Sequence, residues 1–196
     1  MVNPQNTSRV FYGNLLPIAG EYIVDPVHSF TEFNVQHLVV GQIWGRFDSI
    51  YGSVKIADDP MLSSVQVTID TASVSTHNKD RDNDLRGPRY FDVEKYPKMT
   101  FISTGIRLET RGRFTVDGNL TLRGVTRPLS LAMKLTGIIA DPWGKTRAAF
   151  QAKGSLSRKD FGLTTELDRE TGGLLVGKDV AIRIATEVIL KSEANP

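Results

Sequence analysis

The chain has 196 residues, of which 40% are hydrophobic and 23% are charged, as in an ordinary soluble globular protein of about one domain. Its formal net charge of +2 is too small to indicate a nucleic-acid partner or an anionic membrane surface. The absence of cysteine excludes disulfides, thiolate nucleophiles, iron–sulfur clusters and zinc sites with cysteine ligands.

The first residues contain no basic stretch followed by a long apolar stretch, which a secretory leader requires. The sequence also lacks an apolar run of about 18 residues, the length that a membrane-spanning helix needs. We therefore expect a cytoplasmic protein that does not insert stably into a membrane.

Alternating apolar and polar residues are the dominant pattern, and they occur in runs at 65–69, 114–122, 129–135 and 180–190. Such alternation predicts β-strands with one face on a core and the other in water. Turns are predicted between the runs by short segments rich in Gly, Pro and Asp, namely Asp58-Asp59-Pro60, Asp117-Gly118, Gly124, 141–144 and 172–173. Many short antiparallel strands indicate a sandwich or a barrel, and a barrel of about eight strands has room for one small ligand.

One highly charged segment, residues 76–96, interrupts the alternation. Either Thr76 or Asn78 is suited to cap a short helix ending at Asp84 or Arg86, before Gly87-Pro88. Long insertions held by a scaffold often carry function. The charge pattern alone favours a solvated loop with local ion pairs over an anion-binding rim.

Two patterns suggest chemistry that their surroundings do not support. Residues 172–178 match the glycines and lysine of a phosphate-binding loop, but Asp179 replaces the hydroxyl residue and a strand pattern follows, so a glycine-rich turn is predicted. His28, His37 and His77 are not spaced as metal ligands, and we expect no metal site. No nucleophile-elbow motif is present, and we expect no enzymatic activity.

A series of short segments stands in a specific order: DPVHS at 25–29, HL at 37–38, GRF at 45–47, RDNDLR at 81–86, YFDVEKYP at 90–97, TF at 100–101, GNLTLRGVTRP at 118–128, RKDFG at 158–162 and VG at 176–177. In order and spacing they resemble the YceI-like family, from about Glu21 to Leu190. The resemblance implies an all-β protein: an extended, lipocalin-like antiparallel barrel of about eight strands with a short helical insertion around residues 76–90. It places a single barrel domain at 20–191, an N-terminal extension at 1–19 and a C-terminal tail at 192–196.

The resemblance also implies a hydrophobic tunnel that holds a polyisoprenoid or another long amphiphilic lipid. Family members are regarded as binding or carrier proteins without established catalysis, so no cofactor is required, and the expected ligand is a bound polyisoprenoid or isoprenoid quinone. Some members form dimers, which makes a homodimer an expectation here. Many are periplasmic and carry a cleaved leader, which the present sequence does not display.

Apolar character and strand parity predict the tunnel residues, although these two properties do not separate ligand contact from core packing. They are Phe33, Val35, Phe47, Val54, Val67, Ile69, Phe101, Phe114, Val116, Leu120, Leu131, Met133, Phe150 and Ile184. The candidates for a diphosphate head group are Arg81, Arg86 and Arg158, and those for a quinone are His37 and Tyr90. Arg158 has an equally favoured structural alternative, in which it ties the barrel closed.

The leading hypothesis is non-enzymatic binding or carriage of a long-chain isoprenoid, either a polyprenyl quinone or a polyprenyl phosphate-like lipid. A second hypothesis is an enzyme that acts on a small amphiphile inside the barrel, using His37 with Glu32 or Asp160. A third is a stress or scaffold protein whose barrel is simply a packed core.

Overall fold

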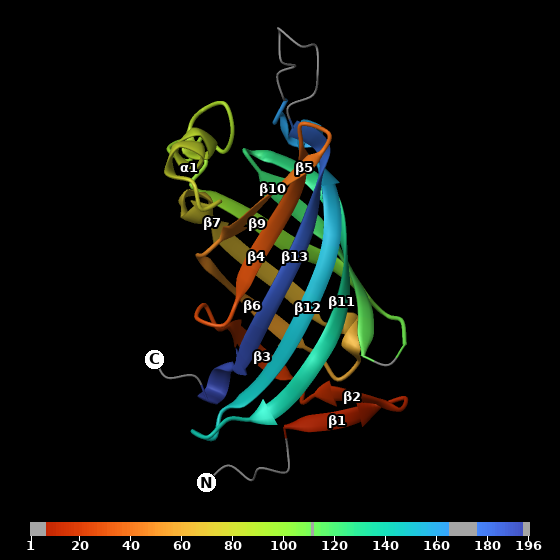
Figure 1. The fold of residues 1–196 in the computed structure, drawn as a ribbon. Coiled ribbons are helices and arrows are strands. Elements are labelled where there is room, and N and C mark those ends of the chain that lie inside the picture. Colours follow the sequence, from red (N-terminus) through yellow and green to blue (C-terminus); the bar gives the residue numbers. More distant parts are fainter. Residues whose placement is uncertain (1–6, 111, 165–175, 194–196) are drawn as a thin grey trace, which may run out of the picture.

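The computed structural model describes residues 7–110, 112–164 and 176–193, and most of them lie in strands (Figure 1). The strands are β1 (Ser8–Phe11), β2 (Asn14–Pro17), β3 (Gly20–Val24), β4 (Phe30–His37), β5 (Gly41–Phe47), β6 (Ile50–Ile56), β7 (Ser64–Asp70), β8 (Val74–Ser75), β9 (Lys98–Leu108), β10 (Arg113–Leu122), β11 (Val125–Ala140), β12 (Thr146–Ser157) and β13 (Val176–Leu190). One α-helix, α1 (Lys79–Arg86), stands between β8 and β9.

The larger sheet closes on itself because β13 has partners along both edges. On one side it pairs with β12, and on the other it pairs with β3 at Val188–Leu190 and with β4 along residues 176–185. β3 and β4 thus form one long strand interrupted at residues 25–29. β5 and β6 likewise form one long interrupted strand, in which β5 pairs with β4 and β6 pairs with β3.

Counted in this way, eight long antiparallel strands follow one another around the barrel in chain order, and β12 and β13 complete the circle. The predicted eight-stranded, lipocalin-like barrel is confirmed. Among the described residues, closure gives each long strand a partner on both sides in the half of the barrel opposite α1, which removes a template for aggregation.

The helix forms where the charged insertion was predicted to contain one. Asn78 is the N-cap, and its side-chain oxygen accepts a hydrogen bond from the Arg81 backbone N–H at 3.0 Å. Gly87 ends the helix, as expected for the residue before Pro88. Because β8 ends at Ser75 and β9 begins only at Lys98, residues 76–97 cover the barrel wall at that level (Figure 1).

The turn predicted at Asp117-Gly118 is wrong. Both residues lie inside β10, at a shift in the β9–β10 register. A Cβ at position 118 would overlap the ring of Phe101, so glycine is needed for the close approach of this aromatic side chain. Glycine within a strand pattern is a known mark of such bulges. The glycine-rich turn predicted at 172–173 lies outside the described residues.

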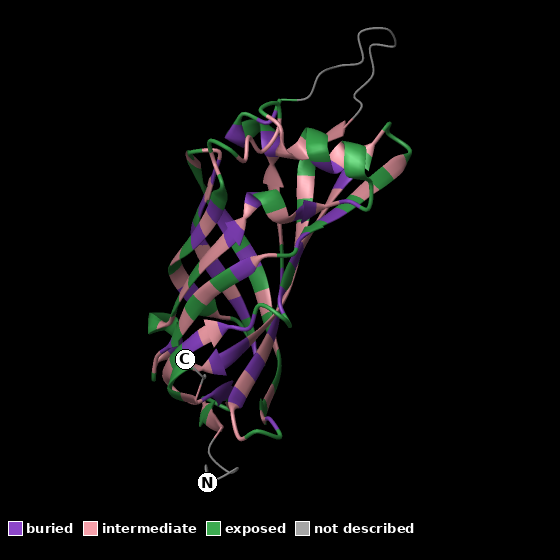
Figure 2. Ribbon diagram, turned by 90° about the vertical axis from the view of Figure 1, so that its left-hand side faces the viewer, coloured by how far each residue is buried: buried purple, intermediate pink, exposed green. Residues whose placement is uncertain are grey.

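Side chains alternate between the inside and the outside of the barrel, so buried and exposed residues alternate along the strands (Figure 2). The β1–β2 hairpin forms a separate sheet at the end of the barrel opposite α1 (Figure 1), and its Leu16 is almost fully buried. Among the described residues, the helices are too short and too polar to cross a membrane.

Candidate functional site

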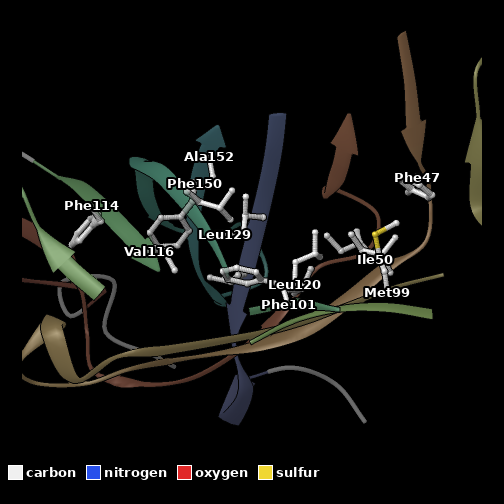
Figure 3. Close-up of a cluster of buried hydrophobic side chains, with 14 of the residues drawn as sticks. Phe47, Ile50, Met99, Phe101, Phe114, Val116, Leu120, Leu129, Phe150 and Ala152 are labelled. Carbon is white, nitrogen blue, oxygen red and sulfur yellow. The ribbon is translucent and has the colours of Figure 1, made fainter. Parts of the chain in front are cut away.

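The barrel interior encloses a cavity of about 280 Å³. All of the predicted tunnel residues, from Phe33 to Ile184, lie on its wall. Figure 3 shows part of this lining, with side chains from β5, β6, β9, β10, β11 and β12 distributed along the interior. Their contact with a lipid stays a prediction, but their convergence on one apolar cavity follows from strand parity and barrel closure.

Both ends of the cavity receive side chains that are not among the predicted tunnel residues. Leu16 and Pro17 of β2 lie at the end that the hairpin covers. Leu85 of α1 and Phe91, which follows it, lie at the other end. Phe91 packs edge-on against Phe47, with ring centroids 5.3 Å apart. A usable signal existed, since Leu85 and Phe91 are among the few apolar residues of the charged insertion.

Arg158 and Tyr90 are the two head-group candidates that lie on the cavity wall. Arg158 is only 5% exposed, and its guanidinium donates hydrogen bonds to three backbone carbonyls, those of Gly177, Leu163 and Val176, at 2.6, 2.8 and 2.9 Å. Burial lowers the pKa of Arg158, while the nearby Tyr90 opposes this shift. Arg158 thus holds the start of β13 against the segment after β12.

The other three head-group candidates lie outside the cavity wall. Arg81 donates to the hydroxyl and the carbonyl of Thr76, at 2.7 and 2.9 Å. Arg86 donates to the carbonyls of Ala72 and Val74, at 2.9 and 2.8 Å, and so fixes α1 to β8. His37 is half-buried at the end of β4. A head-group role for these three residues stays a prediction.

The catalytic pair suggested for the enzyme hypothesis is not assembled on one face. His37 and Glu32 are five residues apart on β4, so their side chains point to opposite faces of the strand. Thr31 and Phe33, which flank Glu32, line the cavity, and Glu32 therefore faces outward. Asp160 is exposed. Neither of the two proposed acids, Glu32 and Asp160, is thus a partner for His37 on the cavity side.

Polar side chains are rare on the cavity wall, and two of them lie close together on β4 and β13. Thr31 pairs in register with Ile184, and Thr186 lies two residues further along β13. The Thr186 hydroxyl is hydrogen-bonded to Ser29 at 2.8 Å. Thr31 is 7% exposed, and its hydroxyl oxygen has no hydrogen-bond partner among the described residues. An unsatisfied buried hydroxyl costs about 1–3 kcal/mol.

A partly buried network of ion pairs joins β12 and β13 to the segments that follow β3 and β11. Arg147 contacts Asp25 at 2.6 Å, Asp141 at 2.8 Å and Glu187 at 3.1 Å, and His28 contacts Asp25 at 2.9 Å. Burial favours the neutral Asp25, but hydrogen bonds from Arg147, His28 and the Val27 N–H outweigh it and lower the Asp25 pKa to about 2. The Arg147 guanidinium offsets part of this negative charge and donates to all three carboxylates, which gives the cluster a structural role.

Comparisons with known proteins agree with this geometry. A family model for the YceI-like domain matches residues 22–188. UPF0312 proteins of Yersinia enterocolitica and Yersinia pseudotuberculosis are each 42% identical to the chain over 153 residues, covering 76% of it and 79% of each relative.

Solved structures also resemble the barrel. A YceI protein of Campylobacter jejuni is 27% identical, with a TM-score of 0.67 over 80% of this chain and 90% of that one. BcnA of Burkholderia cenocepacia, 23% identical, has a TM-score of 0.73 over 84% and 98% of the two chains. A polyisoprenoid-binding domain from Saccharophagus degradans is 16% identical, with a TM-score of 0.64 over 88% and 99%.

Proposed function

The chain belongs to the YceI-like family, and we propose that its barrel binds a long-chain isoprenoid in the central cavity without catalysing a reaction. The observation that carries the proposal is the cavity wall, which consists almost entirely of aliphatic and aromatic side chains from every long strand. A flexible, methyl-branched chain matches such a wall, because binding then requires only the burial of apolar surface. The polyisoprenoid-binding domain among the structural relatives supports this choice of ligand.

The energetic argument needs no catalytic group. Each buried methylene-sized group contributes about 0.8 kcal/mol before the cost of ordering the chain is subtracted. Several isoprene units therefore suffice for stable retention. The role that follows is storage or carriage of a lipid that would otherwise aggregate in water.

The packed-core hypothesis is less well supported, since a scaffold barrel would fill its interior with side chains rather than enclose an apolar cavity. The finer choice between a polyprenyl quinone and a polyprenyl phosphate-like lipid belongs to this proposal. Arg158 gives little support to the phosphate, because its guanidinium is already engaged with three carbonyls.

The proposal is tested by titrating delipidated protein with a long-chain polyprenol and, in parallel, with an unbranched fatty acid. Native mass spectrometry counts the bound molecules. One polyprenol per barrel, bound more tightly than the fatty acid, is the expected result. Failure to bind the polyprenol, or a clear preference for the unbranched chain, would contradict the proposal.

A further inference from the structure

We propose that the β1–β2 hairpin is the end wall of the cavity, and that Leu16 on this hairpin sets the length of the isoprenoid chain that the barrel accepts. This inference rests on the proposed function, since it assigns a specificity-determining residue within the same cavity. The hairpin lies at the end of the barrel opposite α1 (Figure 1) and outside residues 22–188, which match the family model, so the family pattern does not account for it.

The hairpin separates the cavity from water. On β2, Leu16 and Pro17 are buried and line the cavity, whereas the preceding Leu15 is 57% exposed. Successive side chains of a strand point to opposite faces, so Leu15 lies on the water side and Leu16 on the cavity side. Leu16 is only 2% exposed, which means that its side chain fills this end of the barrel and leaves almost no opening to solvent.

Two side chains of the hairpin fasten it to separate parts of the barrel rim. The Arg9 guanidinium donates to the backbone carbonyls of Ala57 and Asp58, just after β6, at 2.5 and 2.6 Å. The Asn14 side-chain oxygen accepts a hydrogen bond from the Gly112 N–H, between β9 and β10, at 3.1 Å. A wall held at two places stays at a fixed position along the barrel, as a limit on ligand length requires.

The shape and the chemistry of the cavity make its closed end the feature that limits the ligand. β13 contributes lining residues from Val176 to Val188, which lie about 40 Å apart along the strand, and an eight-stranded barrel is narrow. The wall is almost entirely apolar, so hydrogen bonds do not hold the ligand at one depth. An apolar chain therefore gains burial until its terminal isoprene unit meets the hairpin.

Shortening Leu16 should lengthen the preferred chain. Leu16→Ala removes the three outer carbons of a side chain on the cavity wall, and the vacated space adds to the cavity. Each additional methylene-sized group that the ligand buries there strengthens binding about fourfold. Refilling two of the three vacated positions, less the cost of ordering a longer chain, favours the longer ligand about tenfold.

The test offers the delipidated protein an equimolar mixture of polyprenols that differ by one isoprene unit, and native mass spectrometry gives the bound amount of each. In Leu16→Ala, the bound ratio of the next longer polyprenol to the one that the wild type binds best should rise about tenfold. Leu16→Phe should move the preference toward shorter polyprenols, because the larger side chain occupies the end of the cavity. Leu15→Ala makes the same change on the exposed face of β2, so it is the matched control and should keep the wild-type ratio.

Thermal unfolding separates loss of packing from the change in length preference. Leu16→Ala loses buried apolar contacts and should have a lower Tm than Leu15→Ala, and Leu16→Phe decides the question if Leu16→Ala does not fold. A ratio within twofold of the wild type in the Leu16 variants, or an equal shift in Leu15→Ala, would overturn the end wall while leaving isoprenoid binding intact. If the wild-type protein binds none of the polyprenols, the proposed function fails and the end wall fails with it.

Discussion

A charge placed on the cavity wall should be far more damaging than the same charge on the outer face. Val116 of β10 lines the cavity and is 2% exposed, whereas Asn119 on the same strand is exposed. Val116→Asp loses about 1.5–3 kcal/mol of apolar burial. The new carboxyl must also lose its charge or remain charged in an apolar site.

Protonation sets an upper limit on the cost of the charge itself. Neutralising a carboxyl with an ordinary pKa of about 3.9 at pH 7 requires about 4 kcal/mol, so the total destabilisation is about 6 kcal/mol before the burial of the neutral carboxyl is added. This is comparable with the whole stability of many domains. The cost should decrease by about 1.4 kcal/mol for each pH unit between 7 and 5, because protonation becomes easier.

Urea unfolding followed by circular dichroism at pH 7, 6 and 5 measures this directly. Asn119→Asp should stay within about 0.5 kcal/mol of the wild type at each pH. Val116→Asn carries no titratable group and should show no corresponding pH dependence. Wild-type stability of Val116→Asp at pH 7, with retained lipid, would refute the inward position of Val116 beside a closed apolar cavity.

Three further predictions concern the cavity and its supports. Ala152→Leu should keep the Tm at or above wild type while reducing bound polyprenol, because the larger side chain occupies cavity volume; unchanged capacity would place Ala152 outside the lipid path. Arg158→Met should lower the free energy of unfolding by about 3–5 kcal/mol through the loss of three carbonyl partners, and a change below about 1 kcal/mol in urea unfolding would contradict that role. Because the pKa of Asp25 is lowered to about 2, its charged carboxylate stabilises the fold above about pH 4. This contribution of about 2 kcal/mol to the free energy of unfolding disappears as the pH falls through 2. The stability difference between wild type and Asp25→Asn should therefore shrink over this range, whereas a constant difference would exclude Asp25 as the titrating group.

Much of the barrel was predictable because period-two alternation and the family resemblance both depend on local sequence. Phe114, Val116 and Leu120 share one strand parity, and barrel closure then brings that parity to one cavity. Closure itself depends on pairing between distant strands, such as β3 with β13, which no local pattern reveals. For the same reason, the contribution of Leu16 from the N-terminal hairpin was not predicted.

The arginines show a different limit of sequence reasoning. Arg81, Arg86 and Arg158 donate mainly to backbone carbonyls, and a carbonyl partner leaves no trace in residue identity. Thr31 lines the cavity with the parity of Phe33 and Val35, but its polar side chain does not fit a prediction based on apolar character. The cytoplasmic location and the homodimer stay predictions.

The most direct test of lipid binding is to extract the purified protein with organic solvent, identify the extract by mass spectrometry, and weigh the intact protein by native mass spectrometry. The account predicts one long-chain isoprenoid per barrel and a native mass increased by that molecule. A ligand-free mass that persists after incubation with prenyl quinones and polyprenols would contradict it.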